Sequence, residues 1–291
     1  NSLLSDLSSA GITAVAAGLR QSLGELGGLD LDALSDATRI DVDVTRTAFA
    51  NALDGFAFAY GDVAVGGWRN SPYVVAQNVG AFLDVPRFLD NDHQIANGAD
   101  AEAYLARLDA YGDQLDGETA RLSHDAALGV IAPDFLVDKC LAQLRQSRAG
   151  TIAEWDLVTS IARRTTAIPG NFAAHAERIA AAKVAPALDR QIAEIERHRA
   201  RATSDAGVWK LPQGDAYYAW ALRAGTTTTM SPDEVHRMGL DQLADLQSQM
   251  DPILRGLGYT RGNVGERMTA LGKDPRFLFP DSDEGRAQII A

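Results

Sequence analysis

Apolar residues recur at intervals of three, four and seven positions along most of this 291-residue chain, which is the spacing of amphipathic α-helices. The clearest stripe follows Asp100, a residue type that caps helix N-termini. Its apolar positions are Tyr104, Leu108, Tyr111, Leu115 and Leu122. The pattern predicts a long helix with one buried face.

Three more helices are indicated between residues 133 and 201. The first opens at Pro133, because proline is favoured in the first helical turn. The second follows Thr151-Ile-Ala-Glu154, which matches a capping box. The third runs from about Val184 to about Arg201, and Pro186 lies near its start or kinks it. Their apolar faces comprise Val137, Leu141 and Leu144, then Trp155, Val158 and Ile161, then Val184, Leu188, Ile192 and Ile195.

The strongest helix start is Ser231-Pro-Asp-Glu234, which combines a serine cap, proline at the first helical position and glutamate at the third. Its apolar positions are Val235, Leu243, Leu246, Met250 and Ile253. Gly256 and Gly258 are expected to end this helix. Residues 281–291 begin like another helix with an acidic first turn, and we expect them to be an interrupted element.

Strand signals are few. The best candidate is Thr226–Thr229, a β-branched run that precedes the Ser231 cap. The pattern therefore predicts an all-α protein, a bundle or array of amphipathic helices with at most one or two short edge strands near 226–229. Neither an internal repeat nor a low-complexity linker is present, and a boundary inside the chain is best placed in the loop 203–214.

The formal net charge of −12 and the pI of about 4.8 narrow the range of partners. General nucleic-acid binding needs a basic surface that neutralises phosphates, so a nucleic-acid partner is not expected. The sequence contains no apolar run of about 18 residues, so it predicts no membrane span. Cys140 is the only cysteine, which rules out an internal disulfide, and its apolar helical setting indicates a buried, unreactive thiol.

The five histidines show no paired-ligand spacing such as HExxH. His93 follows Asp92 in a polar stretch, and His175 and His198 are expected on solvated helix surfaces. A metal site needs three or four converging ligands, so we assign no metal ligand and no catalytic residue in this chain. Motifs for nucleophilic serine, phosphate or dinucleotide chemistry are also absent from the sequence.

The segment from Leu211 to Leu240 is the best candidate for a binding site. In one interpretation, Tyr217 and Tyr218 belong to a helix that packs on the core and the threonines form a loop. In the other, the phenols donate hydrogen bonds at a cleft, Arg223 holds a carboxylate, and the threonine run pairs with an extended peptide. His236, one turn into the next helix, is then a fourth substrate-binding residue.

Three segments in consistent order resemble the bacterial family catalogued as domain of unknown function 885. They begin at Asn70-Ser-Pro-Tyr-Val-Val75, at Asp100-Ala-Glu-Ala-Tyr-Leu105 and at Leu211-Pro-Gln-Gly-Asp-Ala-Tyr-Tyr218, and the last continues through His236. The resemblance implies a largely helical protein about twice this length, grouped with zinc metallopeptidases of the HExxH type. It also implies that the zinc ligands lie in a C-terminal half, because no position here matches them.

The leading hypothesis is therefore that residues 1–291 form the N-terminal, cleft-wall portion of a zinc-dependent peptidase. Zinc is expected only in a full-length family member, with the C-terminal half and a peptide substrate as partners. The alternative is a stand-alone, non-catalytic helical protein that binds a peptide or another partner. The resemblance implies that many family members are exported or are lipoproteins, so a periplasmic or exported location is one expectation, and a cytoplasmic location is the alternative.

Overall fold

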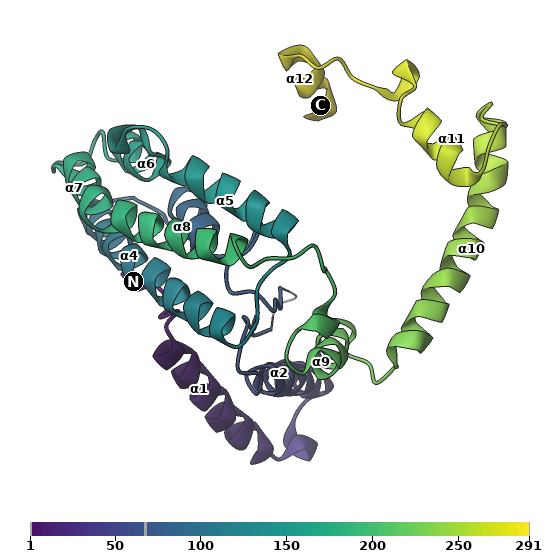
Figure 1. Ribbon diagram of the computed structural model, residues 1–291, viewed down its shortest axis with the longest axis horizontal. Helices are drawn as coiled ribbons and strands as arrows, with labels where there is room; N and C mark the ends of the chain where they lie inside the picture. The colour runs from purple at the N-terminus through teal and green to yellow at the C-terminus, as the bar shows by residue number, and fades with distance from the viewer. Residues whose placement is uncertain (1, 67–68, 291) are drawn as a thin grey trace. The chain divides into compact units, whose positions relative to one another are not determined.

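The structure is a computed structural model that describes residues 2–66 and 69–290 (Figure 1). It is an all-α array, as the hydrophobic pattern predicts. The described residues form no β-strand, only two isolated bridges, Asp62 with Ser71 and Ala76 with Val79. The chain divides into two compact units, residues 1–228 and 229–291, and the loop 203–214 lies within the first.

The helices of the first unit have the following bounds. They are α1 (Ser9–Gly27), α2 (Asp36–Gly55), α3 (Ala81–Arg87), α4 (Gly98–Ala127), α5 (Asp134–Arg148), α6 (Asp156–Arg164), α7 (Phe172–Ile179), α8 (Ala185–Arg199) and α9 (Gly214–Thr226). Short 3₁₀ turns span Leu31–Ala33, Ile152–Glu154 and Val208–Lys210.

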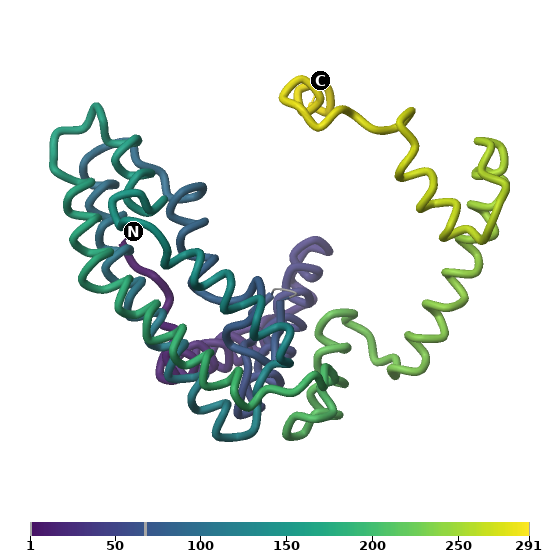
Figure 2. The backbone as a smooth tube through the Cα atoms, turned by 45° about the horizontal axis from the view of Figure 1, so that its top comes forward, coloured from purple at the N-terminus to yellow at the C-terminus, as the bar shows by residue number. Residues whose placement is uncertain are grey.

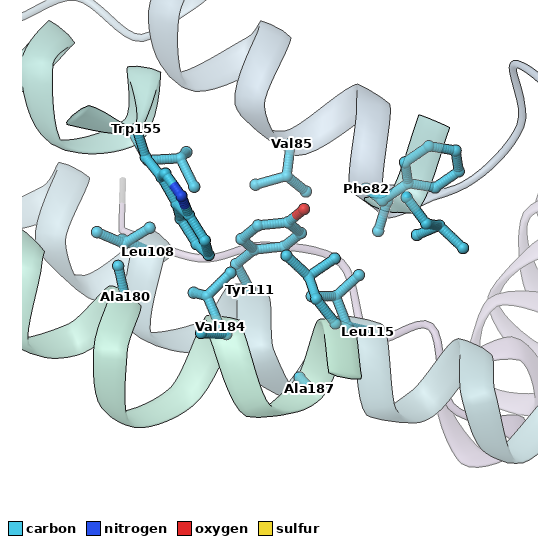
Figure 3. Packing of buried hydrophobic residues seen from close by; sticks show 14 of the residues in the cluster. Phe82, Val85, Leu108, Tyr111, Leu115, Trp155, Ala180, Val184 and Ala187 are labelled. Carbon is cyan, nitrogen blue, oxygen red and sulfur yellow. The ribbon is translucent and has the colours of Figure 1, made fainter. Parts of the chain in front are cut away.

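The main core of the first unit surrounds α4, which packs against α7 and α8, while α5 packs against α8 (Figure 2). The predicted stripe on α4 is buried, and Tyr104, Leu108 and Leu115 are fully enclosed. Figure 3 shows the ring of Tyr111 between Val85 and Val184, which come from α3 and from the turn before α8. One long helix with a continuous apolar face therefore organises most of this unit.

Two prolines inside helical runs are accompanied by wider, π-helical turns. Pro86 lies within α3, and a π turn, Phe88–Asp92, follows it. Pro186 lies in the first turn of α8, directly after the π turn Ala180–Val184 that continues α7. Proline lacks the N–H for the usual helical bond and its ring crowds the preceding turn, and π turns are one way in which a helix accommodates such a break.

The caps of two helices differ from the sequence prediction. The N-cap of α4 is Asn97, whose side chain accepts from the backbone N–H of Asp100 at 3.2 Å; Asp100 is the third residue of a capping box. Thr151 precedes a 3₁₀ turn, and α6 begins only after Trp155. Asparagine and aspartate are both good caps, so composition alone could not decide between neighbouring candidates.

No strand forms at Thr226–Thr229, the best strand candidate in an all-α prediction that allows at most one or two short strands. Thr226 ends α9, and its Oγ1 donates to the carbonyl of Leu222 at 2.8 Å. Thr227 adopts a left-handed conformation with φ of 54°, which closes the helix. Threonine hydroxyls that bond to nearby backbone compete with strand formation, and here the helix end prevails.

The second unit contains α10 (Pro232–Gly256), α11 (Val264–Leu271), a 3₁₀ turn (Pro275–Phe277) and α12 (Asp283–Ile290). The predicted capping box is confirmed, since Ser231 Oγ accepts from Glu234 N at 3.3 Å and Glu234 accepts from Ser231 N at 2.8 Å. Arg267 of α11 is buried and pairs with Asp251 of α10 at 2.5 Å. No helix in the described part of the chain combines the length and apolar character that crossing a bilayer requires.

Candidate functional site

Helix α9 carries the predicted tyrosine pair, Tyr217 and Tyr218. Tyr217 is buried, and so is Trp220 on the same face of the helix. Tyr217 and Trp220 are three positions apart, so they project from the same side of the helix. They form a small second core with Tyr60, Val130 and Leu211. Tyr218, on the other side, has half of its surface exposed. Tyr217 therefore packs in this core and Tyr218 is accessible from solvent, and a substrate contact by either phenol stays a prediction.

The aromatic rings of this second core are in direct contact. Tyr217 lies 5.1 Å from Trp220, 5.2 Å from Phe58 and 5.6 Å from Tyr60, measured between ring centroids. The indole N–H of Trp220 donates to a carbonyl on α2 at 2.8 Å. At Gly55 an added Cβ would lie 2.2 Å from the indole ring, so only glycine fits there. These contacts fix Trp220 against α2.

A cleft of about 410 Å³ opens between α2, α9 and the residues Ala64, Gly66 and Asn70. Trp220 forms part of its wall, and Thr47, Asn51 and Asn70 contribute polar groups. Thr227, in its left-handed conformation, lies at the end of α9 beside the same space. The volume lies in the range of small-ligand sites, and amide and hydroxyl groups on an aromatic wall suit a peptide or another polar organic molecule.

Arg223 lies on α9 and is already engaged. Its guanidinium contacts a carboxylate oxygen of Asp54 at 2.6 Å, and both side chains are about half exposed. An exposed ion pair of this kind contributes little to stability, so a ligand carboxylate could replace Asp54 at small cost. A carboxylate-binding role for Arg223 stays a prediction.

His236 is exposed on α10, in the second unit. Its grouping with Tyr217, Tyr218 and Arg223 therefore stays a prediction.

Comparison with models of protein families shows the family to which the chain belongs. The family model for bacterial proteins of unknown function, DUF885, matches residues 1–291. The chain belongs to the DUF885 family. The resemblance identified from the three sequence segments is thereby confirmed.

A solved structure resembles this DUF885 chain closely. It is described as a putative lipoprotein from Colwellia psychrerythraea, with a TM-score of 0.84 and 26% sequence identity. The alignment covers 97% of this chain and 49% of the Colwellia protein, so the chain spans about half the length of that relative. No curated protein matches the chain.

The polar groups of the DUF885 chain do not assemble a metal centre within residues 2–66 and 69–290. In these ranges no three His, Cys, Asp or Glu side chains lie together in a way that could hold a metal ion. The available donors therefore do not fit a zinc ion, and no step of a zinc mechanism is assigned to them.

Two histidines differ from the sequence prediction. His198 is buried, and its Nε2 lies 3.1 Å from a carboxylate oxygen of Glu194, one turn earlier on α8. His93 is buried beside Arg107, and burial lowers the pKa of its imidazole. The sequence places His93 in a polar stretch and predicts a solvated helix surface for His198, because their sequence neighbours are polar or charged. Tertiary packing against other helices encloses them instead.

Sequence reasoning also missed Glu118, a carboxyl in the interior of the first unit. It is buried on α4, and its burial raises the pKa of the carboxyl to about 8. Glu118 lies three residues after Leu115 and four before Leu122, within the apolar stripe. A charged residue at a core position of a helical stripe is the signal that could have identified it.

Proposed function

We propose that residues 1–291 form the N-terminal, substrate-facing portion of a longer zinc-dependent peptidase whose metal site lies beyond residue 291. The observation that carries the proposal is the unequal coverage in the structural match, which is 97% of this chain and 49% of the Colwellia protein. Membership of the DUF885 family supports it, together with the zinc metallopeptidase relationship that the resemblance implies. The description of the Colwellia protein also favours an exported location for this chain.

An exposed apolar face on α10 supports a further partner within the same protein. Leu243, Leu246 and Ile253 expose 51%, 55% and 62% of their surface, and Leu257 exposes 44%. These residues follow one another at three, four and seven positions, so they form one stripe. Surface helices normally bury such a stripe, and large exposed apolar patches mark interaction sites. We assign this face to contact with the C-terminal half.

The α2–α9 cleft is the proposed position for part of the peptide substrate. Asn51, Asn70 and Thr47 can hydrogen-bond to peptide groups, while Trp220 packs on a side chain. Tyr218 is an accessible phenol on the side of α9 opposite Trp220 and remains a proposed substrate contact outside the cleft. Arg223 can exchange Asp54 for a substrate carboxylate. Tyr217 packs against Trp220 on the buried side of α9 and holds the indole in position. His236 remains a proposed substrate contact.

Cleft-filling substitutions test this assignment in the longer protein. Thr47→Trp would place an indole in the cleft, whereas Ala50→Trp adds the same group to an exposed position of α2 outside it. We expect Thr47→Trp to lower kcat/KM for fluorogenic peptides at least tenfold, and Ala50→Trp to change it less than twofold. Equal effects of the two variants would contradict the assignment. Failure of the zinc-loaded wild type to cleave any peptide would contradict the peptidase class.

The alternative is a stand-alone helical protein that binds a peptide or another partner through the same cleft. The cleft favours it, because its size and lining suit binding without any catalytic group. The two functions differ in the expected behaviour of α10. If the apolar face of α10 contacts a missing half, isolated residues 1–291 should self-associate or bind a hydrophobic dye, and Leu246→Glu should reduce both. A monomer with little dye binding would favour the stand-alone protein.

A further inference from the structure

The segment before α1 is an extended strip of chain that follows α4. Residues 2–7 belong to no helix or strand, and Ser8 caps α1. Leu4 and Leu7 pack partly against the main core. The segment therefore lies on the first unit in the way that a short bound peptide would.

Three side chains of α4 donate to the backbone carbonyls of this segment. Arg107 Nε donates to Leu3 O at 3.2 Å. Gln114 Nε2 donates to Ser5 O at 2.5 Å, and Arg121 Nη1 reaches Leu7 O at 3.4 Å. Positions seven apart on a helix share one face, and alternate residues of an extended chain present their carbonyls to one side. The two periodicities match, so side chains of α4 bond to the backbone of the segment, while Leu4 and Leu7 add apolar contacts.

A glycine lets the segment approach the helix. An added Cβ at Gly117 of α4 would lie 3.0 Å from the nitrogen of Ser8 and 3.2 Å from the carbonyl carbon of Leu7. Glycine in the middle of a helix destabilises it relative to alanine. Close contact with an extended backbone is a physical reason for this residue at this position.

Two of the donors are held in place by other partners. Arg107 also donates to His93 and lies 5.0 Å over the ring of Phe88. Arg121 also donates to a carboxylate oxygen of Asp62 at 2.8 Å. These interactions do not involve the N-terminal segment. The groove would therefore keep its shape if the segment left, which reduces the cost of binding another peptide.

A cavity of about 330 Å³ continues the groove beside Ser5 and Leu7. Gln114 and Glu118 of α4 also line it. The buried Oε1 of Gln114 has no hydrogen-bond partner. The groove thus has room for side chains larger than serine, next to a polar atom that is not satisfied by the chain's own segment.

We propose that this α4 groove, formed by Arg107, Gln114, Gly117 and Arg121, is a binding site for an extended peptide. The chain's own residues 2–8 occupy it in the structure described. The ligand is an extended polypeptide with leucine-like side chains three positions apart, bound mainly through its carbonyl oxygens. This site is separate from the α2–α9 cleft and does not depend on peptidase activity.

Fluorescence anisotropy with a labelled peptide of residues 1–8 tests the proposal on the full chain. A segment attached in cis competes at an effective concentration of about millimolar. We therefore expect the chain carrying Leu4→Ser and Leu7→Ser to bind the peptide at least tenfold more tightly than the wild-type chain. Adding Gly117→Leu to that variant should abolish binding. A control peptide with serine in place of both leucines should bind at least tenfold more weakly.

Equal binding of both peptides, or undiminished binding after Gly117→Leu, would overturn the proposal. A second measurement avoids destabilising variants. A fluorophore on Ser2→Cys reports the mobility of the segment, and Cys140 is buried and should not react. Excess unlabelled peptide should displace the segment and lower the anisotropy of the probe. An unchanged anisotropy at millimolar peptide would also overturn the proposal.

Discussion

Replacing Glu118 by glutamine should change how the stability of the protein depends on pH. Glu118 is 3% exposed, and its Oε1 accepts a hydrogen bond from Ala81 N at 2.9 Å. A glutamine oxygen can accept the same bond. The Oε2 of Glu118 accepts from Gln191 Nε2 at 3.3 Å, and the partnerless Oε1 of Gln191 can turn to accept from the new amide. The substitution therefore removes the titrating proton and still gives both polar atoms of the new side chain a partner.

The direction in which the free energy of unfolding changes with pH follows from the pKa of the Glu118 carboxyl in the folded and in the unfolded chain. Burial raises the pKa of Glu118 from its usual 4.5 to about 8 in the folded chain. The unfolded chain releases the proton near 4.5, so the free energy of unfolding falls as pH rises from 4.5 to 8. At about 1.4 kcal/mol per pKa unit, the full loss is about 5 kcal/mol. The substituted chain does not have this loss.

Urea denaturation of both chains at pH 5 and pH 8.5 measures the effect. The difference in unfolding free energy between Glu118→Gln and the wild type should shift in favour of the variant by about 3 to 5 kcal/mol from pH 5 to pH 8.5. Glu102→Gln is a matched control, because Glu102 is exposed on the same helix. The corresponding difference between Glu102→Gln and the wild type should change by less than about 0.5 kcal/mol over the same pH range. A Glu118→Gln effect that is constant within about 1 kcal/mol would refute the reasoning.

Three further predictions concern the packing of residues on α2, α4, α5 and α9. Gly55→Ala should destabilise the chain by about 1 to 3 kcal/mol in urea, because the added methyl overlaps Trp220; an unchanged midpoint would contradict this contact. Tyr217→Phe should leave the free energy of unfolding unchanged or raise it, since the buried hydroxyl of Tyr217 has no hydrogen-bond partner. Tyr104→Phe removes a 2.8 Å hydrogen bond to Leu157 O and should lower the free energy of unfolding by about 1 kcal/mol. Equal losses in the two variants would contradict this difference. Cys140 should resist a thiol reagent until urea unfolds the chain, because burial raises the pKa of its thiol to about 12, and rapid labelling of the native chain would be inconsistent with this burial.

Local signals in the sequence predicted much of the helical framework. The capping box at Ser231 and the apolar stripe that contains Tyr104 both correspond to helices at the expected places. Such features depend on residues within one or two turns of each other, so the sequence contains all the information they need. The same reasoning identified Cys140 as a buried residue.

Features that depend on distant contacts could not be read in this way. His198 has charged neighbours in sequence, yet packing against other helices buries it. Thr226–Thr229 has the composition of a strand, but no neighbouring strand is available in the described structure, and hydroxyl–backbone bonds end α9 there instead. The α2–α9 cleft joins residues more than 150 positions apart, so only the fold reveals it.

Zinc analysis of purified residues 1–291 beside a full-length family protein tests the central claim most directly. The account predicts about one tightly bound zinc per full-length chain and none in residues 1–291 after dialysis. Stoichiometric, tightly bound zinc in residues 1–291 alone would contradict the claim that the metal site lies beyond residue 291.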